Sequence, residues 1–202
     1  LAGNLLLITH RRVVSILALA LATLSKWFAG VAAPLFFWRT PWWGIPLFLA
    51  AAAAFLLPYR EAGAKLFTGL GTYAAEWRNN ESLFGLLLAA TGEDAIAMGV
   101  GLGVVAGLAF HLGRRRREPL GACLVLLAAV LLLSPSIFPW YVTWIVPFLC
   151  FYPHPALLAF TATVWLSYHV LIDYSALGIW RYQPWLLWLE YLPVYALLFA
   201  SR

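Results

Sequence analysis

Three basic residues of this 202-residue chain lie in positions that suit a functional site. Lys26 lies between two apolar runs, and Arg78 and Arg181 lie in segments rich in aromatic residues. Such cations could bind an anionic group of a ligand. A lone ammonium group in or near a membrane often marks a functional site. An equally good interpretation is that the Lys26 side chain extends to the membrane interface and has no function of its own.

Aromatic and amide side chains accompany these cations. Trp77, Trp140 and Tyr141 could stack on sugar rings or line a groove for a lipid, and Asn79 and Asn80 could form hydrogen bonds with hydroxyl groups. A single aromatic residue at a membrane interface is more often part of the aromatic belt than a ligand contact. The concentration of aromatic, amide and charged residues in a few segments is the better signal, and it suggests a polar substrate at the boundary of a bilayer.

The carboxylates give no clear catalytic base. Glu76 and Glu81 could in principle act as acid and base, but residues five apart share a helix face poorly, and solvated carboxylates are the commoner case. Glu190 lies within an apolar run and should be paired for structural reasons. The four histidines show no metal-ligand spacing, so we expect neither a metal site nor a cofactor.

Composition sets the fold class within which these residues must be positioned. Hydrophobic residues make up 64% of the chain and charged residues 10%, against about 45–50% and about 25% in an ordinary soluble domain. This excludes a soluble enzyme, a disordered chain and a disulfide scaffold. It predicts an all-α polytopic transmembrane bundle of about seven or eight helices, since a crossing takes about 20 residues. The formal net charge of +5 does not indicate nucleic acid, because the run Arg114 to Arg117 between two apolar segments is typical of a cytoplasmic loop.

Breaks between apolar runs predict the individual helices. They lie near residues 13–25, 27–38, 42–58, 94–112, 119–134, 139–152, 155–172 and 184–200, with one long external loop at about 59–93. The first two are short half-helices that meet near Lys26, and the alternative is a single helix over 13–38. Two half-helices are favoured because they put Arg11, Arg12 and the run at Arg114 on the same side of the membrane.

Three segments of the chain carry a recognisable pattern. They are residues 20–37, 69–84 and 133–149, which contain Ser25 and Lys26 at a helix end, Tyr73 and Trp77 with Asn79 or Asn80, and Pro139, Trp140 and Tyr141 at the opening of a late helix. Together they resemble the GT-C class of integral-membrane glycosyltransferases. Within this class they are most similar to the bacterial mannosyltransferase-like proteins, which use polyprenyl-phosphate sugars as donors.

This resemblance implies a function and a location. The expected reaction is transfer of a sugar from a polyprenyl-phosphate-linked donor to a sugar or glycolipid acceptor, on the external (periplasmic) side of the bacterial inner (plasma) membrane. Membrane lipid is then a further partner. The residues expected to bind substrate are Lys26, Tyr73, Trp77, Arg78, Asn79, Asn80, Trp140, Tyr141 and Arg181.

Two departures from the family pattern bear on this expectation. Phe138 stands before Pro139 where such proteins often have histidine, which puts a binding role for an imidazole there in doubt. The family's catalytic carboxylate lies in the first external loop near the N-terminus. We therefore expect residues 1–202 to form a single transmembrane domain that is the C-terminal part of a longer protein, with the catalytic base N-terminal to Leu1.

Two other functions fit the same residues. A transporter or flippase could use Lys26, between two half-helices, as a substrate site in a broken helix. Such proteins show paired interruptions in both halves, and the sequence shows only one clear interruption. A structural or assembly subunit without chemistry is the third possibility, and it predicts that replacing Lys26 or Arg78 changes stability alone.

Overall fold

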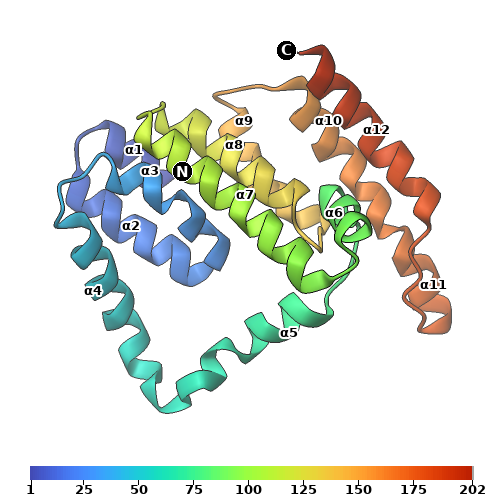
Figure 1. Cartoon of the computed structure of the whole chain (residues 1–202), viewed down its shortest axis with the longest axis horizontal. Helices are drawn as coiled ribbons and strands as arrows, with labels where there is room; N and C mark the ends of the chain where they lie inside the picture. Colours follow the sequence, from blue (N-terminus) through green and yellow to red (C-terminus); the bar gives the residue numbers. More distant parts are fainter. Residues whose placement is uncertain (202) are drawn as a thin grey trace. The chain divides into compact units, whose positions relative to one another are not determined.

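The computed structural model describes residues 1–201, apart from the side chains of residues 74–76. Every regular element in this part of the chain is a helix, as composition predicted (Figure 1). Leucine and alanine dominate the apolar runs and are strong helix formers. A helix also satisfies its own backbone hydrogen bonds, which an apolar environment requires.

The helices follow one another with short connections. In the first part of the chain they are α1 (Ala2–Ile8), α2 (Arg12–Ser25), the 3₁₀ helix η1 (Trp27–Ala32), α3 (Ala33–Phe37), α4 (Gly44–Leu56), η2 (Leu57–Phe67), α5 (Thr68–Glu76) and α6 (Leu83–Thr91). In the second part they are α7 (Asp94–Arg114), α8 (Pro119–Leu132), η3 (Pro139–Trp144), α9 (Val146–Leu149), α10 (Pro155–Thr163), η4 (Val164–His169), α11 (Val170–Leu177) and α12 (Pro184–Ala200).

Three helical stretches are long and apolar enough to cross a membrane. They are Gly44–Tyr73, Asp94–Arg114 and Pro155–Leu177, with 30, 21 and 23 residues. Length and composition therefore fit a membrane protein. Four further apolar helices are shorter, so the expected seven or eight crossings stay a prediction.

The predicted break at Lys26 is confirmed, and a single continuous helix over residues 13–38 is wrong. Helix α2 ends at Ser25, and Lys26 has an extended backbone with φ −150° and ψ 108°. The helical chain resumes at Trp27 as η1. An extended residue cannot continue the helical hydrogen-bond ladder, so the two half-helices are separate elements.

The prediction of one long loop at residues 59–93 is wrong in its secondary structure. Most of this segment is helical, in η2, α5 and α6. Its scattered charges resemble a loop, but a helix tolerates exposed charges equally well. The apolar run Leu83–Thr91 forms α6 and ends at Gly92, which adopts the left-handed conformation, with φ 72°, that glycine accepts without a steric penalty.

The chain forms two compact units, divided within α7 and α8. The first unit contains residues 1–76 and 102–126. In it α2 packs against α1 and α4, and the fully buried Ile16, Ala20 and Leu35 form part of its core. The Asn4 amide donates a hydrogen bond of 3.3 Å to the Cys123 thiol, which joins α1 to α8.

The second unit contains residues 77–101 and 127–202. Helices α10 and α12 pack side by side (Figure 1). Phe84, Ile137, Phe160 and Val194 are buried in the core of this unit. Proline residues at 135 and 139 lie on either side of a short extended stretch, because proline disfavours helix both at its own position inside an element and at the preceding residue.

Candidate functional site

The second unit holds an irregular segment of residues 77–82, here called the polar loop, between α5 and α6. Asn79 anchors it to the extended stretch after α8 by a parallel bridge to Ser136. The Ile137 amide donates to the Asn79 carbonyl at 2.8 Å, and the Asn79 side-chain amide donates to the Ile137 carbonyl at 3.0 Å. Two segments 58 residues apart in sequence are thus held together through backbone groups.

Asn80 joins the polar loop to the C-terminal part of the chain. Its backbone has φ 58°, in the left-handed region that asparagine tolerates better than most residues. Its side-chain nitrogen donates to Glu190 Oε1 at 2.7 Å, and its side-chain oxygen accepts from the Tyr182 hydroxyl at 2.9 Å. The Tyr191 hydroxyl donates to its carbonyl at 3.1 Å. Both ends of the Asn80 amide are therefore used inside the protein, so its observed contacts anchor the loop.

Glu190 is fully buried on α12, and the structural pairing predicted for it is confirmed by the hydrogen bond from Asn80. Its second oxygen, Oε2, receives no hydrogen bond from the residues that the structure describes. One turn further along the same helix, the Tyr195 hydroxyl is hydrogen-bonded to the Ser82 hydroxyl. Helix α12 thus holds the polar loop at both Asn80 and Ser82.

Arg78 lies among carboxylates. Its Nη2 pairs with Asp94 at the start of α7, and its Nε lies 3.6 Å from Glu81 Oε1. Its guanidinium carbon lies 4.8 Å from the centre of the Phe84 ring. The remaining nitrogen, Nη1, is buried without a hydrogen-bond partner among the described residues. Arg78 therefore has one nitrogen without a partner among the described residues, enclosed by the protein, and two acidic neighbours that would compete with an anion.

Burial raises the pKa of Glu81, and the charge of Asp94 raises it further, while Arg78 opposes the shift. A carboxyl group with a raised pKa takes up a proton more readily than an ordinary glutamic acid. Protonation of Glu81 would remove one of the two negative charges beside Arg78. The affinity of this arginine for an anion is thus linked to the protonation of its neighbour.

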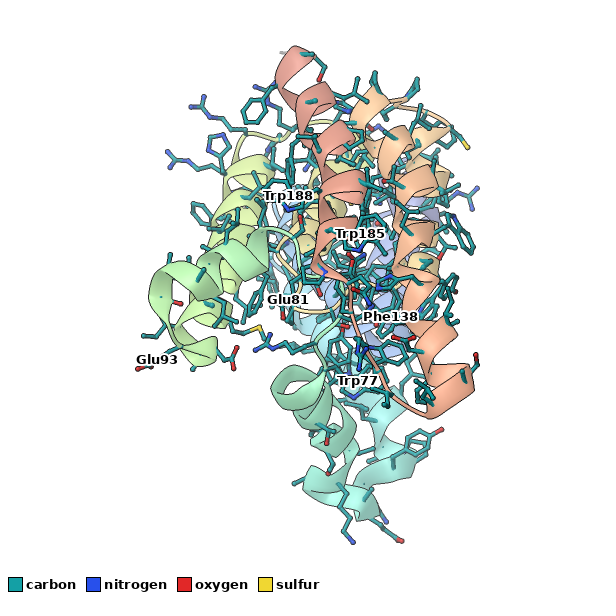
Figure 2. All side chains as sticks on the ribbon, turned by 90° about the vertical axis from the view of Figure 1, so that its right-hand side faces the viewer. Trp77, Glu81, Glu93, Phe138, Trp185 and Trp188 are labelled. Atoms are coloured by element: carbon teal, nitrogen blue, oxygen red, sulfur yellow. The ribbon has the colours of Figure 1, made fainter. Side chains whose placement is uncertain are left out.

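An aromatic cluster adjoins the polar loop and is centred on the buried Phe138. Phe138 stacks on Trp140 with ring centres 4.5 Å apart and an interplanar angle of 4°. Three further rings meet it at steeper angles, with centres 5.9, 5.8 and 6.4 Å away, and belong to Trp77, Tyr141 and Trp180. Figure 2 shows Trp77 beside Phe138. Phe138 is thus the ring that joins the members of this cluster.

The outer rings of this cluster are partly exposed to the surroundings. Trp77, Trp140 and Trp180 are each about half exposed, at 47%, 48% and 45%. Flat, partly exposed rings can stack on a sugar or cover an isoprenoid chain. Arg181, next in sequence to Trp180, is exposed.

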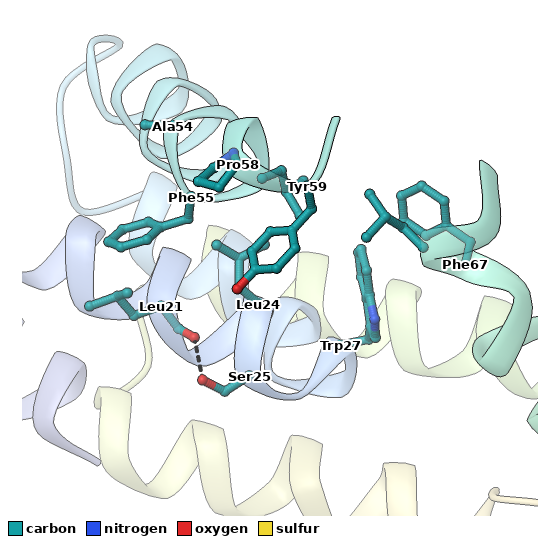
Figure 3. A pocket seen from close by; sticks show the side chains of 11 residues that line it. Leu21, Leu24, Ser25, Trp27, Ala54, Phe55, Pro58, Tyr59 and Phe67 are labelled. Carbon is teal, nitrogen blue, oxygen red and sulfur yellow. Dashed lines mark hydrogen bonds between the residues drawn. The ribbon is translucent and has the colours of Figure 1, made fainter. Parts of the chain in front are cut away.

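Two predicted site residues belong to the first unit. Lys26 is exposed at the break between the half-helices, and Tyr73 is half-buried in α5. A cavity of about 520 Å³ opens beside the break, lined mainly by apolar side chains of α2, α4 and η2 (Figure 3). Trp27 and Phe67 face each other across part of it, with ring centres 5.5 Å apart.

The structure thus gathers six of the nine predicted residues in the second unit near the polar loop, which are Trp77, Arg78, Asn79, Asn80, Trp140 and Tyr141. The side chain of Glu76 lies outside the described residues. No cluster of three or more potential metal ligands occurs among the described residues.

Sequence reasoning missed several partners in this site. They are Phe138, Tyr182, Tyr191, Tyr195 and Asp94. One signal was present, because Tyr191 and Tyr195 are four residues apart and therefore share a face of α12. The pairing of Asn80 with Glu190 spans 110 residues and has no local signal.

Known proteins offer no direct guide to this site. Comparison of the chain with protein-family models, with curated proteins and with solved structures gave no match.

Proposed function

We propose that this chain belongs to a membrane glycosyltransferase of the GT-C class, which transfers a sugar from a polyprenyl-phosphate donor to a sugar or glycolipid acceptor. The proposal places the reaction at the external face of the bacterial inner membrane. One observation carries it. Two of the segments that resemble the family, distant in sequence, lie together in one unit, with Asn79 bridged to Ser136 and Trp77 against Phe138.

In this proposal the residues divide into two roles. The exposed rings of Trp77 and Trp140 contact the sugar or the isoprenoid chain, and Arg181 and Arg78 are the cations assigned to the phosphate. Asn79 and Asn80 hold the loop in shape rather than touching the substrate, since their side chains are bonded within the protein. The catalytic base is not assigned to any residue of this chain.

Lys26 supplies a further cation in the first unit. It is exposed beside the apolar cavity, whose lining of Leu21, Leu24 and Phe55 would suit an apolar chain (Figure 3). A phosphate at an ammonium group and an isoprenoid in an apolar cavity are the two halves of the expected donor.

The test is transfer of radiolabelled sugar from a polyprenyl-phosphate donor, in membranes that contain the intact protein. Lys26→Ala and Arg78→Ala should each lower the rate about 100-fold at equal expression, because Arg78→Ala removes a cation assigned to the phosphate in the second unit and Lys26→Ala removes the cation beside the apolar cavity of the first. Arg60→Ala and Lys65→Ala are matched controls, since these exposed cations of η2 have no assigned role. Unchanged transfer in both Lys26→Ala and Arg78→Ala would contradict the proposal.

A transporter or flippase is the second candidate, and the extended backbone of Lys26 between two helices favours it. The two functions differ in their product. A glycosyltransferase cleaves the donor and glycosylates the acceptor, whereas a flippase moves the intact lipid-linked sugar across the bilayer. Sealed vesicles with donor on one side and no acceptor separate the two, because only a flippase changes the sidedness of the donor there.

A further inference from the structure

The C-terminal end of α7 forms a second cavity that the proposed transfer reaction does not use. It has a volume of about 320 Å³ and is lined by Phe110, His111, Arg114 and Arg115. Two of these four residues are arginines. Its volume lies near the lower end of the range of about 300–1,000 Å³ found for small-molecule sites.

No carboxylate is among the residues that line this cavity. Among the described residues, both ion pairs involve Arg78 in the second unit. The nearest acidic residue in sequence is Glu118, whose two oxygens accept hydrogen bonds from the backbone amides of Leu120 and Gly121, at 3.0 and 2.7 Å. Glu118 thus caps the N-terminus of α8, and its charge also acts on Arg39.

The backbone around the cavity is fixed by its own contacts. Arg39 donates from one nitrogen to the Leu35 carbonyl at 2.8 Å and from another to the Arg117 carbonyl, which ties the turn after α7 to the end of α3. Gly113 allows close packing there, since a β-carbon would lie 2.9 Å from the Pro34 carbonyl oxygen.

One wall of the cavity is also held in place. The Phe110 ring meets Trp38 edge to face, with centres 4.9 Å apart. The cavity is therefore formed before any ligand binds, with an aromatic wall and two exposed arginines.

The position of the cavity at the end of α7 indicates which class of ligand it would bind. It lies at the end of a 21-residue helix that is long and apolar enough to cross a membrane, so it meets the boundary between lipid tails and head groups. The half-exposed ring of Phe110 suits the apolar lipid tails at this boundary, and the exposed arginines suit the charged head groups. The C-terminal end of a helix carries partial negative charge, so an anion must be held by side chains.

We propose that this cavity binds the phosphate-bearing head group of an anionic membrane phospholipid. Arg114 and Arg115 hold the phosphate through paired guanidinium hydrogen bonds, and Phe110 packs against the glycerol and the first carbons of the chains. A free phosphate ion has the same charged chemistry, but it would gain nothing from the aromatic wall. The proposal is independent of the transfer reaction.

The test measures lipid retained by the purified full-length protein in native mass spectrometry, with phosphatidylglycerol and phosphatidylcholine as probes. We expect one tightly held phosphatidylglycerol and no such species with phosphatidylcholine. The double substitution Arg114→Gln/Arg115→Gln should weaken this binding about 30-fold, which corresponds to about 1 kcal/mol for each charge. Arg11→Gln/Arg12→Gln removes the same charge from another exposed pair and should leave the binding unchanged.

Two results would overturn the proposal. Equal weakening by both double substitutions would mean general attraction to positive charge, and displacement of the lipid by an equal concentration of inorganic phosphate would mean a site for a free anion. Arg114→Lys/Arg115→Lys keeps the charge and the fold but loses the paired hydrogen bonds. It should weaken binding severalfold, and full binding in this variant would contradict the assigned geometry.

Discussion

The polar loop of the second unit and the basic turn at Arg114–Arg117 in the first unit use charge in opposite ways. In the polar loop, Arg78 pairs with Glu81 and Asp94, and Asn80 is bonded at both ends of its amide. In the basic turn, the one acidic neighbour, Glu118, caps a helix.

This difference distinguishes two roles of polar residues in an apolar chain, a structural role and a ligand-binding role. Polar groups that the protein pairs internally keep a segment in shape, and cations that it leaves unpaired remain available to an outside anion. By this criterion the aromatic rings are the parts of the polar-loop region best placed for a ligand, and in the basic turn the arginines themselves are.

The largest effect is expected from Glu190, the buried residue on which the polar loop depends. Glu190→Ala should lower the free energy of unfolding by about 2–3 kcal/mol, because it leaves the Asn80 amide buried without its acceptor. Glu190→Gln keeps an acceptor oxygen and should lose less. Thermal unfolding in detergent measures both, with Trp188→Ala, an exposed position on the same helix, as the control. An equal loss of unfolding free energy in Glu190→Ala and Trp188→Ala would contradict the anchoring role of Glu190.

A smaller effect is expected at the basic turn, where packing rather than pairing sets the backbone. Gly113→Ala should destabilise by about 1–2 kcal/mol, since the new β-carbon meets the Pro34 backbone at 2.9 Å. Gly107→Ala is the matched control on α7, because nothing lies within 4 Å of its β-carbon and alanine favours helix. Chemical denaturation of the two variants should therefore give shifts of opposite sign, and shifts of the same sign would argue against the tight packing.

The smallest effect concerns pH and the polar loop. Because the pKa of Glu81 is raised, mainly by burial, its contribution to stability is present while the carboxyl is protonated. That contribution is lost as the pH rises from the ordinary value of 4.5 through the raised pKa. We expect the unfolding free energy of the wild type to fall by about 0.5 kcal/mol across this range relative to Glu81→Gln, the partial exposure of the side chain keeping the effect small.

The control for the pH experiment is Glu93→Gln, which removes an exposed carboxylate before α7 (Figure 2). Its pH profile should match that of the wild type in the same range. A pH profile of unfolding free energy that is parallel in Glu81→Gln and the wild type would contradict a raised pKa of Glu81.

Much of the helical structure followed from the sequence, because a run of apolar helix formers such as residues 47–57 has few alternatives. The break at Lys26 also followed, because two half-helices put Arg11, Arg12 and the run at Arg114 on the same side of the membrane. Residues 59–93 did not, since scattered charges there suit an exposed helix as well as a loop. The partners of Asn80 and Arg78 could not be predicted either, because Glu190 and Asp94 are brought to them by tertiary packing that spacing does not encode.

The most direct test of the proposed function compares two exposed tryptophans. Trp140 belongs to the aromatic cluster and Trp188 lies on α12 outside it. In membranes with the intact protein, Trp140→Ala should lower sugar transfer from the polyprenyl-phosphate donor about tenfold or more, since it removes a stacking surface. Trp188→Ala should transfer at the wild-type rate. Equal rates in the two variants, at equal amounts of folded protein, would contradict a substrate site at the aromatic cluster.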